Sequence, residues 1–402
     1  MDGSVLIVGA SVAGVGVLNE LRRLGFNGQI TLVDSDPEYP YDRPPLSKSV
    51  LTGDPSIDGV LLHQRPHYDG LKAKIIRASS AIRLDGERRE VELDSGARIS
   101  ADFIVIATGS RARPFLADGA QGLVLTLRSY CDAMRLRALL QPRISVAIVG
   151  GGFIGAEVAS SVRAIGADAT IIERDPLPLE RVLGTTVARR VASLHEAAGV
   201  VQVCDTGVER IRQMLSGRQY LELANGTSIE ADVVVAGLGN IPNVEWAAGS
   251  GVEIDNGIFC DGSGRTRMPG IYAAGDVARW QSHDGGHARR HEHWTAAREQ
   301  ARIVAHAIAG AEPEKAWGAF LPYFWSDLHG RRLQALGRTS GIDDVRLAFE
   351  NPDKGSFLYE YYEAGNLAGV AGIGVAGKIT RYNHVLTDVG EGARTKIEET
   401  VN

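Results

Sequence analysis

The chain has 402 residues, of which 44% are hydrophobic and 23% are charged, and its formal net charge is −6. This length predicts two or three domains, each with its own core, and the negative charge argues against nonspecific binding to nucleic acid or an anionic membrane. Because neither a signal peptide nor an apolar run of about 18 residues is visible, we expect a soluble, cytoplasmic protein.

The first predicted elements form a strand, a glycine-rich turn, a helix and a second strand. The strand covers Val5 to Val8, the helix Val12 to Leu24, and the second strand Ile30 to Val33. The turn between the first two reads GASVAG, a GxGxxG pattern with serine at the middle glycine, and Asp34 follows its last glycine by 20 residues. Such a turn brings backbone N–H groups to a pyrophosphate, and an acid at this distance accepts ribose hydroxyls. A turn that serves only helix packing is the alternative. The candidate dinucleotide-binding residues are Gly9, Ser11, Gly14 and Asp34.

An apolar strand that ends in glycine closes this unit, and another closes a second unit of the same kind, which is described next. Phe103 to Ala107 precede Thr108 and Gly109, and Val233 to Ala236 precede Gly237.

The second unit starts at Ser145 to Val149 and repeats the pattern with the complete motif GGGFIG. Its helix is predicted over Phe153 to Ile165 and its returning strand over Ala169 to Ile172, which ends at Glu173. A carboxylate there binds a free 2′-hydroxyl and repels a 2′-phosphate, so NADH is favoured over NADPH. The neighbouring Arg174 weakens this argument. The candidate residues are Gly150, Gly152, Gly155 and Glu173.

A third glycine turn lies further along the chain, at Gly275 and Asp276. It follows a short apolar strand, and we expect it to precede a helix that begins near Val277. Asp276 can accept hydrogen bonds from ligand hydroxyls, or it can serve as a simple N-cap.

Beyond Trp317 the pattern changes to alternating segments, which predict a third, smaller domain with an antiparallel sheet. The expected strands are Leu333 to Leu336, Val345 to Ala348, Phe357 to Tyr361 and Leu367 to Val375, and a helix is expected from Gly377 to Asp388.

Cys131, Cys204 and Cys260 lie far apart in the chain. This spacing argues against a metal cluster or a redox-active disulfide and favours buried structural thiols.

Several segments together resemble the NADH-dependent ferredoxin reductases of oxygenase systems, over essentially the whole chain. They are YDRPPLSK at 41–48, GGGFIGAE at 150–157, Gly275-Asp276 and FWSD at 324–327. That family belongs to the glutathione-reductase-like flavoproteins. The resemblance implies an α/β fold with two Rossmann-like dinucleotide-binding domains and a C-terminal α+β domain. The FAD domain would cover 1–110 and 236–318, the NAD domain 111–235, and the C-terminal domain 319–402.

The resemblance also implies roles for individual residues. Lys48 and Glu157 would pair near flavin N5, where a cation stabilises the reduced ring and a carboxylate fixes the lysine. A solvated lysine is the alternative for Lys48. The pattern from Arg290 to Gln300 is similar to the family's helix beside the flavin. FAD would contact Gly9, Ser11, Gly14, Asp34, Arg43, Lys48, Thr108, Gly109, Asp276, Trp294 and Trp325, and NADH would contact Gly150, Gly152, Gly155 and Glu173.

The cysteine positions narrow the electron acceptor. Disulfide reductases and NADH peroxidases on this scaffold need cysteine near the first flavin-facing helix, but no cysteine precedes Cys131. We therefore expect an NADH:ferredoxin reductase that serves an acidic, transiently bound two-iron two-sulfur ferredoxin of a monooxygenase or dioxygenase. A rubredoxin reductase and an NADH-responsive flavoprotein similar to apoptosis-inducing factor are the alternatives.

Docking of an acidic ferredoxin on a net-negative protein requires local cations. The candidate docking residues are Arg289, Arg290, Arg331 and Arg332, with Trp325 beside the flavin. The alternative interpretation is that these arginines are solvated surface charges.

Two positions depart from the family pattern. Ser11 replaces a glycine, and Leu328-His329-Gly330 stand where glutamine and an aromatic residue are common.

Overall fold

The computed structural model describes residues 3–281, 288–314, 317 and 321–387. The chain divides into two compact units, which are described separately. The first unit consists of Met1–Asp42, Ile57–Arg111 and Asn240–Pro322, and the second of Arg43–Ser56, Ala112–Gly239 and Tyr323–Asn402. The domain boundaries expected from the sequence remain a prediction.

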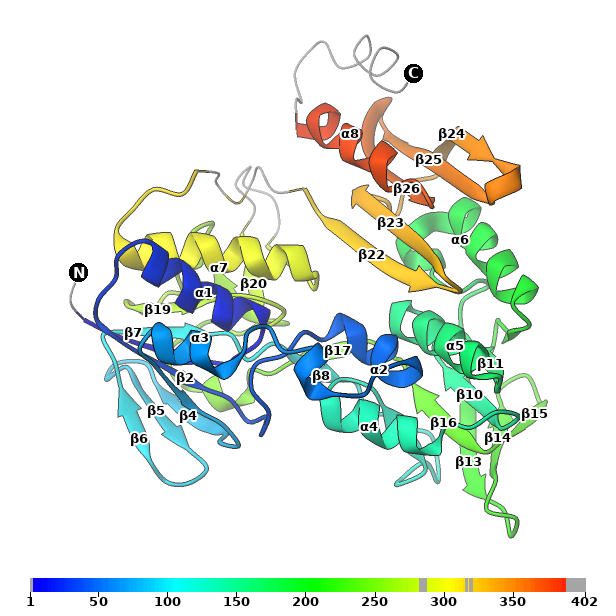
Figure 1. The fold of residues 1–402 in the computed structure, drawn as a ribbon, viewed down its shortest axis with the longest axis horizontal. Coiled ribbons are helices and arrows are strands. Elements are labelled where there is room, and N and C mark those ends of the chain that lie inside the picture. The colour runs from blue at the N-terminus through cyan, green and yellow to red at the C-terminus, as the bar shows by residue number, and fades with distance from the viewer. Residues whose placement is uncertain (1–2, 282–287, 315–316, 318–320, 388–402) are drawn as a thin grey trace. The chain divides into compact units, whose positions relative to one another are not determined.

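The first unit is built on a five-stranded parallel sheet in the order β19-β7-β1-β2-β3 (Figure 1). Its central strands are almost fully buried because both faces are covered, which explains their continuous apolar sequences. Helices α1 and α7 pack closely, since a Cβ atom added at Gly16 would lie 2.8 Å from the Cβ of Ala301. The elements are β1 (Ser4–Val8), α1 (Val12–Arg23), β2 (Gln29–Val33), α3 (Arg65–Gly70), β3 (Ala73–Ile76), β7 (Phe103–Ile106), β19 (Ile271–Ala273) and α7 (Trp294–Ala309).

Smaller sheets complete the first unit. One is an antiparallel meander of β4 (Ala81–Asp85), β5 (Glu90–Leu93) and β6 (Arg98–Ser100). Another joins β18 (Ile258–Cys260), β20 (Ala278–Trp280) and β21 (Arg289–Arg290). β8 (Ser110–Ala112) pairs with β17 (Asn240–Pro242). Two 3₁₀ turns, η2 (Ile57–Gly59) and η3 (Glu245–Ala247), also belong to this unit.

The helix expected from Val277 is wrong, because strand β20 follows the turn at Gly275 instead. Parallel pairing with β18 satisfies the backbone of Ala278–Trp280. The Trp280 indole is buried and donates to the carbonyl of Ala273 at 3.1 Å. Burial of this large side chain against the sheet therefore determines the local structure, and Asp276 is no helix N-cap.

The second unit contains another five-stranded parallel sheet, in the order β12-β11-β10-β16-β9. Helix α4 begins with a capping box between Ser129 and Asp132. The elements are η1 (Pro44–Ser47), α2 (Ser49–Thr52), β9 (Val124–Thr126), α4 (Tyr130–Leu139), β10 (Ser145–Val149), α5 (Phe153–Ile165), β11 (Asp168–Ile172), α6 (Glu180–Ala197), β12 (Val201–Val203) and β16 (Val233–Ala236).

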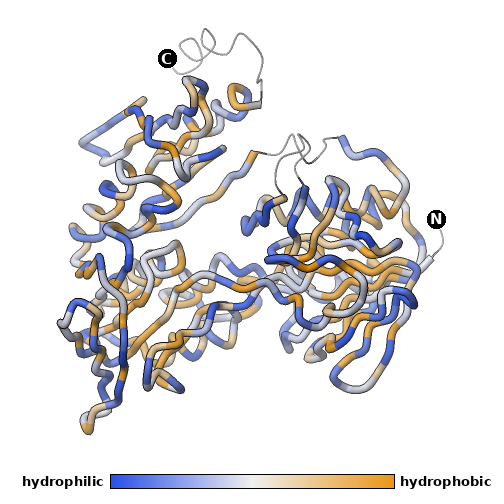
Figure 2. The backbone as a smooth tube through the Cα atoms, turned by 180° about the vertical axis from the view of Figure 1, so that it is seen from behind, coloured by the Kyte–Doolittle hydropathy of each residue, from blue (hydrophilic) through white to orange (hydrophobic). Residues whose placement is uncertain are grey.

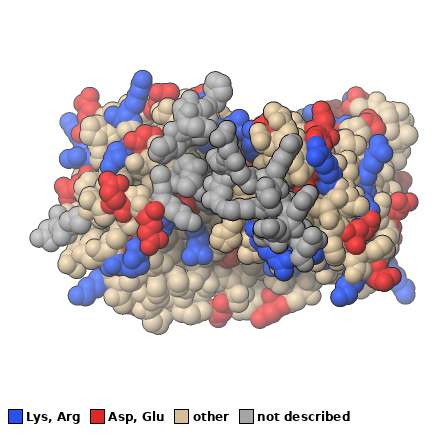
Figure 3. All heavy atoms as spheres, turned by 90° about the horizontal axis from the view of Figure 1, so that it is seen from above, with Lys and Arg blue, Asp and Glu red and all other residues tan. Residues whose placement is uncertain are grey.

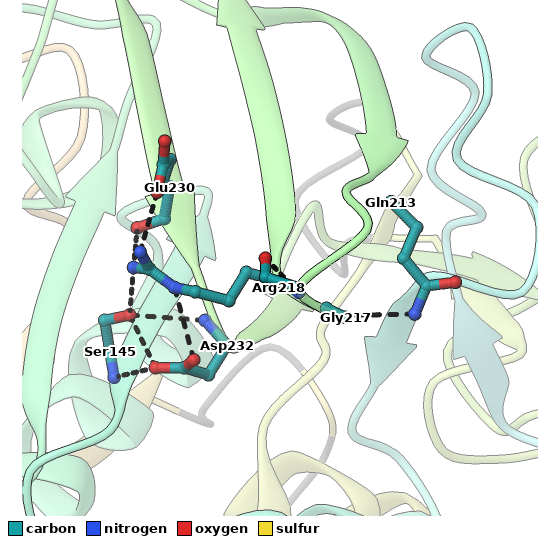
Figure 4. A network of polar contacts seen from close by, with 7 residues as sticks. Ser145, Gln213, Gly217, Arg218, Glu230 and Asp232 are labelled. Carbon is teal, nitrogen blue, oxygen red and sulfur yellow. Dashed lines mark hydrogen bonds and ion pairs between the residues drawn. The ribbon is translucent and has the colours of Figure 1, made fainter.

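A polar network ties this parallel sheet to an antiparallel meander of β13 (Val208–Gln213), β14 (Gln219–Leu223) and β15 (Ser228–Ala231). Arg218 forms ion pairs with Glu230 at 2.6 Å and with Asp232 at 3.3 Å (Figure 4). The Asp232 carboxylate in turn accepts the backbone N–H of Ser145, the first residue of β10, at 2.7 Å. The network therefore fixes the start of β10 relative to the meander.

The end of the described chain forms an antiparallel sheet in the order β22-β23-β26-β25-β24. The four strands expected here overlap β23 to β26. The expected helix corresponds to α8, although its last expected residue, Asp388, lies outside the described residues. The elements are β22 (Tyr323–Leu328), β23 (Arg331–Gly337), β24 (Asp344–Asn351), η5 (Pro352–Lys354), β25 (Ser356–Glu363), β26 (Asn366–Ile373) and α8 (Ala376–Thr387).

The fold class expected from the sequence is confirmed, with two parallel sheets of the Rossmann type and an antiparallel sheet with a helix. Apolar residues run along the strands of both parallel sheets (Figure 2). Of the helices that the structure describes, none combines the length and the apolar character that crossing a membrane requires.

Candidate dinucleotide sites and a buried lysine–glutamate pair

The turn between β1 and α1 has no room for side chains at its first and last glycines. A Cβ atom at Gly9 would lie 2.1 Å from the carbonyl oxygen of Ala107, and one at Gly14 would lie 2.0 Å from the carbonyl oxygen of Gly9. Gly9 also has a φ of +105°, which favours glycine. The turn thus presents bare backbone at the N-terminus of α1, which fits the pyrophosphate of a dinucleotide.

Asp34 lies at the end of β2 and points back to this turn. One of its carboxylate oxygens accepts the N–H of Ala10 at 2.5 Å, and the other accepts the N–H of Asp36 at 2.9 Å. The half-buried Asp34 carboxylate thus lies beside the glycine turn, and its contact with ribose hydroxyls stays a prediction.

The second unit repeats the same geometry. Gly150 has a φ of +102°, and a Cβ atom at Gly155 would lie 2.0 Å from the carbonyl oxygen of Gly150. The buried Glu173 carboxylate accepts the N–H of Gly151 at 2.5 Å and the N–H groups of Arg174 and Asp175 at 2.7 and 3.0 Å. Two independent turns with a strand-end acid are therefore present.

The repeat also explains why serine is tolerated at position 11. Its counterpart in the second turn is Gly152, because each accepts the N–H of the residue four positions later, at 2.9 Å in both turns. A Cβ atom at Gly152 would meet only the carbonyl oxygen of Gly237, at 4.0 Å. A small side chain at this position of the turn therefore meets no steric obstacle from the protein.

Thr108 and Gly109 lie just beyond β7 and are held by Asn243. The Thr108 hydroxyl donates to the carbonyl of Asn243 at 2.8 Å, and the Asn243 side chain donates to the carbonyl of Thr108 at 2.9 Å. Gly109 has a φ of +62°, and its carbonyl accepts the N–H of Asn243 at 3.0 Å. These bonds order the end of β7 at the same edge of the sheet as the first glycine turn.

The turn at Gly275 and Asp276 is fixed from several sides within the first unit. The Asp276 carboxylate accepts the hydroxyl of Ser110 at 2.9 Å, and its carbonyl accepts the guanidinium of Arg290 at 3.0 Å. The N–H of Gly275 donates to the buried side chain of Gln300 at 2.7 Å. Gln300 therefore supports the turn that carries Asp276.

The pattern from Arg290 to Gln300 is helical only in its second part. Helix α7 begins at Trp294, whereas Arg290 belongs to β21 and pairs with Glu292. The Trp294 indole donates to the carboxylate of Asp42 at 2.9 Å. This bond joins the start of α7 to the segment that precedes the RPPLSK motif.

Lys48 and Glu157 form an ion pair of 2.7 Å inside the second unit. The Lys48 side chain is 19% exposed and that of Glu157 is 5% exposed, so the pair is largely shielded from water. The Lys48 ammonium also donates to the carbonyl of Pro44 at 2.9 Å. The lysine is therefore held in place, and the interpretation of Lys48 as a solvated lysine is wrong.

Two serines that the sequence reasoning missed complete this cluster. Ser47 donates to one Glu157 oxygen at 2.5 Å, and Ser326 donates to the other at 2.7 Å. The carbonyl of Ser47 accepts the hydroxyl of Ser161 at 2.6 Å. Ser47 and Ser326 lie inside the motifs RPPLSK and FWSD, so the sequence drew attention to both segments. It did not indicate that the two serines contact Glu157.

Strand β22 presents different side chains on its two faces. Phe324 contacts Phe153 with ring centroids 4.6 Å apart, and Ser326 and Leu328 are fully buried on that face. The half-buried Trp325 stacks on Tyr323 with centroids 6.0 Å apart. Arg43, which the resemblance also implies at the flavin, is half-buried at the start of the second unit. The flavin contacts of Arg43 and Trp325 stay predictions.

Three of the candidate docking arginines are engaged within the protein. Arg332 pairs with Asp327 at 2.8 Å, Arg331 donates to the carbonyl of Gly355 at 2.8 Å, and Arg290 is 12% exposed. Arg289 is exposed. On the face shown in Figure 3, basic and acidic side chains are interspersed. The expected basic docking surface stays a prediction.

A pair of histidines joins α6 to the turn after β22, where the sequence departs from the family pattern. The rings of His195 and His329 are linked by a 2.9 Å contact between Nδ1 of His195 and Nε2 of His329. The N–H of His329 donates to the hydroxyl of Ser160 at 2.6 Å. Burial, and secondarily His329, lowers the pKa of His195 to about 3, and burial also lowers the pKa of His329. Both rings are thus neutral at neutral pH.

The cysteines differ in their surroundings. Cys131 is exposed, so the expectation that all three thiols are buried is wrong for this residue, which lies on the outer surface of α4. Burial raises the pKa of Cys204 to about 11 and also raises that of Cys260. Within the described ranges there is no group of three or more histidine, cysteine or acidic residues that could hold a metal ion.

Two models of known protein families match the chain. A family model described as pyridine nucleotide-disulphide oxidoreductase matches residues 3–301, and one described as reductase C-terminal matches residues 323–397.

The benzene 1,2-dioxygenase system ferredoxin–NAD(+) reductase subunit of Pseudomonas putida is 38% identical over 345 residues, which cover 85% of this chain and 82% of that protein. The rubredoxin–NAD(+) reductase of Pseudomonas putida is 34% identical over 349 residues, covering 87% and 90%. The crystal structure of the covalent putidaredoxin reductase–putidaredoxin complex matches with a TM-score of 0.91 at 29% identity, covering 99% of both chains.

The histidine pair predicts a loss of stability on acidification. The pKa of His195 is lowered in the folded protein. Between pH 6.5 and about 3, His195 is therefore protonated in the unfolded chain but stays neutral in the folded protein. Stability is full above pH 6.5 and falls by up to about 1.4 kcal/mol per pH unit below it. We expect His195→Gln to flatten the fall of the unfolding midpoint between pH 7 and 4, measured by urea titration. The exposed His384→Gln variant is the control, and equal slopes in both variants would contradict the assignment.

Proposed function

The chain belongs to the FAD-dependent pyridine nucleotide-disulphide oxidoreductases, and we propose that it is an NADH:ferredoxin reductase of an oxygenase system. The observation that carries this proposal is the repeated glycine turn with its strand-end acid, because two such turns suit two different dinucleotides. FAD would be held at the first turn and NADH at the second. When bound, the flavin supplies the chemistry that converts a hydride into single electrons.

The residues of the first unit suit FAD in chemistry and space. The turn at Gly9 and Gly14 offers bare N–H groups for the pyrophosphate, and the Asp34 carboxylate lies beside it for the ribose. Asp276 and the ordered end of β7 supply further polar groups at the carboxyl edge of the same sheet. These groups support the assignment of FAD to the first unit.

Glu173 supports a preference for NADH. Its carboxylate is buried and fixed by three backbone N–H groups, so it cannot easily turn away from a ligand at the adjacent turn. A fixed carboxylate accepts the ribose hydroxyls of NADH but repels the 2′-phosphate of NADPH.

Lys48 would supply the positive charge beside the flavin. The Glu157 carboxylate and the carbonyl of Pro44 hold its ammonium group in one position. A preorganised charge stabilises the charge that develops on hydride transfer without the cost of reorganisation. This step needs no protein nucleophile. It therefore does not require a cysteine near the first flavin-facing helix, and no cysteine precedes Cys131 in the sequence.

An external iron–sulfur carrier is the acceptor that best suits these features. The names of the relatives include both a ferredoxin reductase and a rubredoxin reductase, and putidaredoxin is bound to the structural relative. We choose a two-iron two-sulfur ferredoxin as the acceptor because the chain resembles the ferredoxin reductases of oxygenase systems. That resemblance includes the RPPLSK and FWSD motifs and extends over essentially the whole chain. Rubredoxin reduction is the second candidate, favoured by the relative of that name.

Stopped-flow mixing tests the proposed function directly. We expect NADH to reduce bound FAD and a two-iron two-sulfur ferredoxin to reoxidise it rapidly, whereas rubredoxin should reoxidise it more slowly. The flavin absorbance reports both steps. A flavin that NADH reduces but that reacts with neither carrier would contradict the reductase assignment.

Replacing Lys48 with alanine should slow the reduction of the flavin by NADH. Loss of one preorganised electrostatic interaction costs about 3 kcal/mol, or roughly a hundredfold in rate. Lys74→Ala, which removes an exposed lysine of β3, is the control. A change of less than threefold in the Lys48 variant would remove this residue from the mechanism.

Replacing Glu173 with glutamine should reduce the preference for NADH. We expect the ratio of kcat/KM for NADH to that for NADPH to fall by roughly tenfold, because one repulsive charge typically accounts for about 1.4 kcal/mol or more. Asp175→Asn is the matched control, since this acid lies two residues away and pairs with Arg181. An unchanged ratio in the Glu173 variant would assign the preference to other residues.

A further inference from the structure

We propose that Ser326 is a positioning residue for the Lys48–Glu157 pair. Its hydroxyl holds one oxygen of the Glu157 carboxylate, so that the other oxygen stays on Lys48. The inference rests on the proposed function, in which this pair acts beside the flavin.

The contacts of the carboxylate divide between its two oxygens. Oε2 accepts Ser47 Oγ at 2.5 Å and pairs with Lys48 Nζ at 2.7 Å, whereas Oε1 accepts Ser326 Oγ at 2.7 Å. Glu157 is 4% exposed, and a buried carboxylate requires donors on both oxygens. Ser326 therefore fixes the rotation of the carboxylate about its last bond.

The position of Ser326 in β22 supports a role beyond packing. Its neighbours on the same face of the strand, Phe324 and Leu328, contact apolar side chains of the core. A fully buried hydroxyl in this apolar row is costly unless it makes a hydrogen bond, and the bond it makes is to Glu157. The serine is thus explained by the carboxylate that it contacts.

The electrostatic consequence concerns Lys48. Donors on Glu157 take up part of its negative charge, so the carboxylate neutralises the ammonium of Lys48 less completely. Without the Ser326 hydroxyl, Oε1 loses its donor, so Lys48 has to balance more of the negative charge of the carboxylate. The field that Lys48 offers the flavin is then weaker, and reduction of the flavin becomes less favourable.

The structure provides a matched control on helix α5. Ser160 accepts the N–H of His329, one residue beyond the end of β22, at 2.6 Å. Ser160→Ala therefore breaks a bond between the same helix and the same hairpin but leaves the donors of Glu157 intact. Ser326→Thr restores a hydroxyl at position 326 with a residue that suits a strand.

The test compares the midpoint potential of bound FAD, measured by spectroelectrochemistry, in the wild-type holoenzyme and these variants. We expect Ser326→Ala to lower the potential by about 30 mV, which is tenfold in the equilibrium constant of a two-electron couple. The limiting rate of reduction at saturating NADH should fall by about tenfold, with the Kd for NADH unchanged. Ser160→Ala and Ser326→Thr should keep the wild-type potential.

Two outcomes would overturn the inference. One is a wild-type potential in Ser326→Ala. The other is an equal shift of the potential in Ser160→Ala, which would mean that Ser326 only links strand β22 to helix α5. The potential is measured without NADH, so a failure of NADH to reduce the wild-type flavin would count against the proposed function and not against this inference.

Discussion

Close backbone packing at two glycine turns is the constraint on which the rest of the structure depends. Cβ atoms at Gly14 and Gly155 would each lie 2.0 Å from the carbonyl oxygen of the first glycine of the same turn. This contact allows each helix to start directly above its strand, so that its first N–H groups face outward. The strand-end acids Asp34 and Glu173 then reach back to the same turns. One steric requirement, met twice, thus produces two candidate dinucleotide sites.

The Lys48–Glu157 pair depends on a different principle, the cost of burying charge. A carboxylate removed from water is stable only with a cation or several donors, and Glu157 has one of the former and two of the latter. Glu157 itself lies in helix α5, and its partners come from two other segments of the second unit, namely the end of η1 with the following Lys48, and strand β22. The segment after residue 322 therefore contributes Ser326 to the cluster, whereas the resemblance singled out Trp325 of the same strand as a flavin contact.

Much of the fold could be predicted because its local signals agree with its tertiary structure. The strands and helices around Gly9 and Gly150 have apolar periodicity, glycine turns and terminal acids that all indicate the same elements. The helix expected after Asp276 was wrong because burial of Trp280 and pairing with β18 outweighed a local turn signal. Ser326 and the histidine pair could not be predicted as partners, since their contacts join residues more than 130 positions apart. Such pairings depend on packing that a single sequence does not reveal.

The measurement that tests the central claim most directly compares Gly14→Ala with Gly155→Ala, because the account gives each turn its own dinucleotide. The Gly155 variant should purify with one FAD, and dithionite should reduce that FAD while NADH fails to do so at the wild-type rate. The Gly14 variant should lose FAD on purification. Loss of FAD from both variants, or reduction of the Gly155 variant by NADH at the wild-type rate, would contradict the assignment of one dinucleotide to each turn.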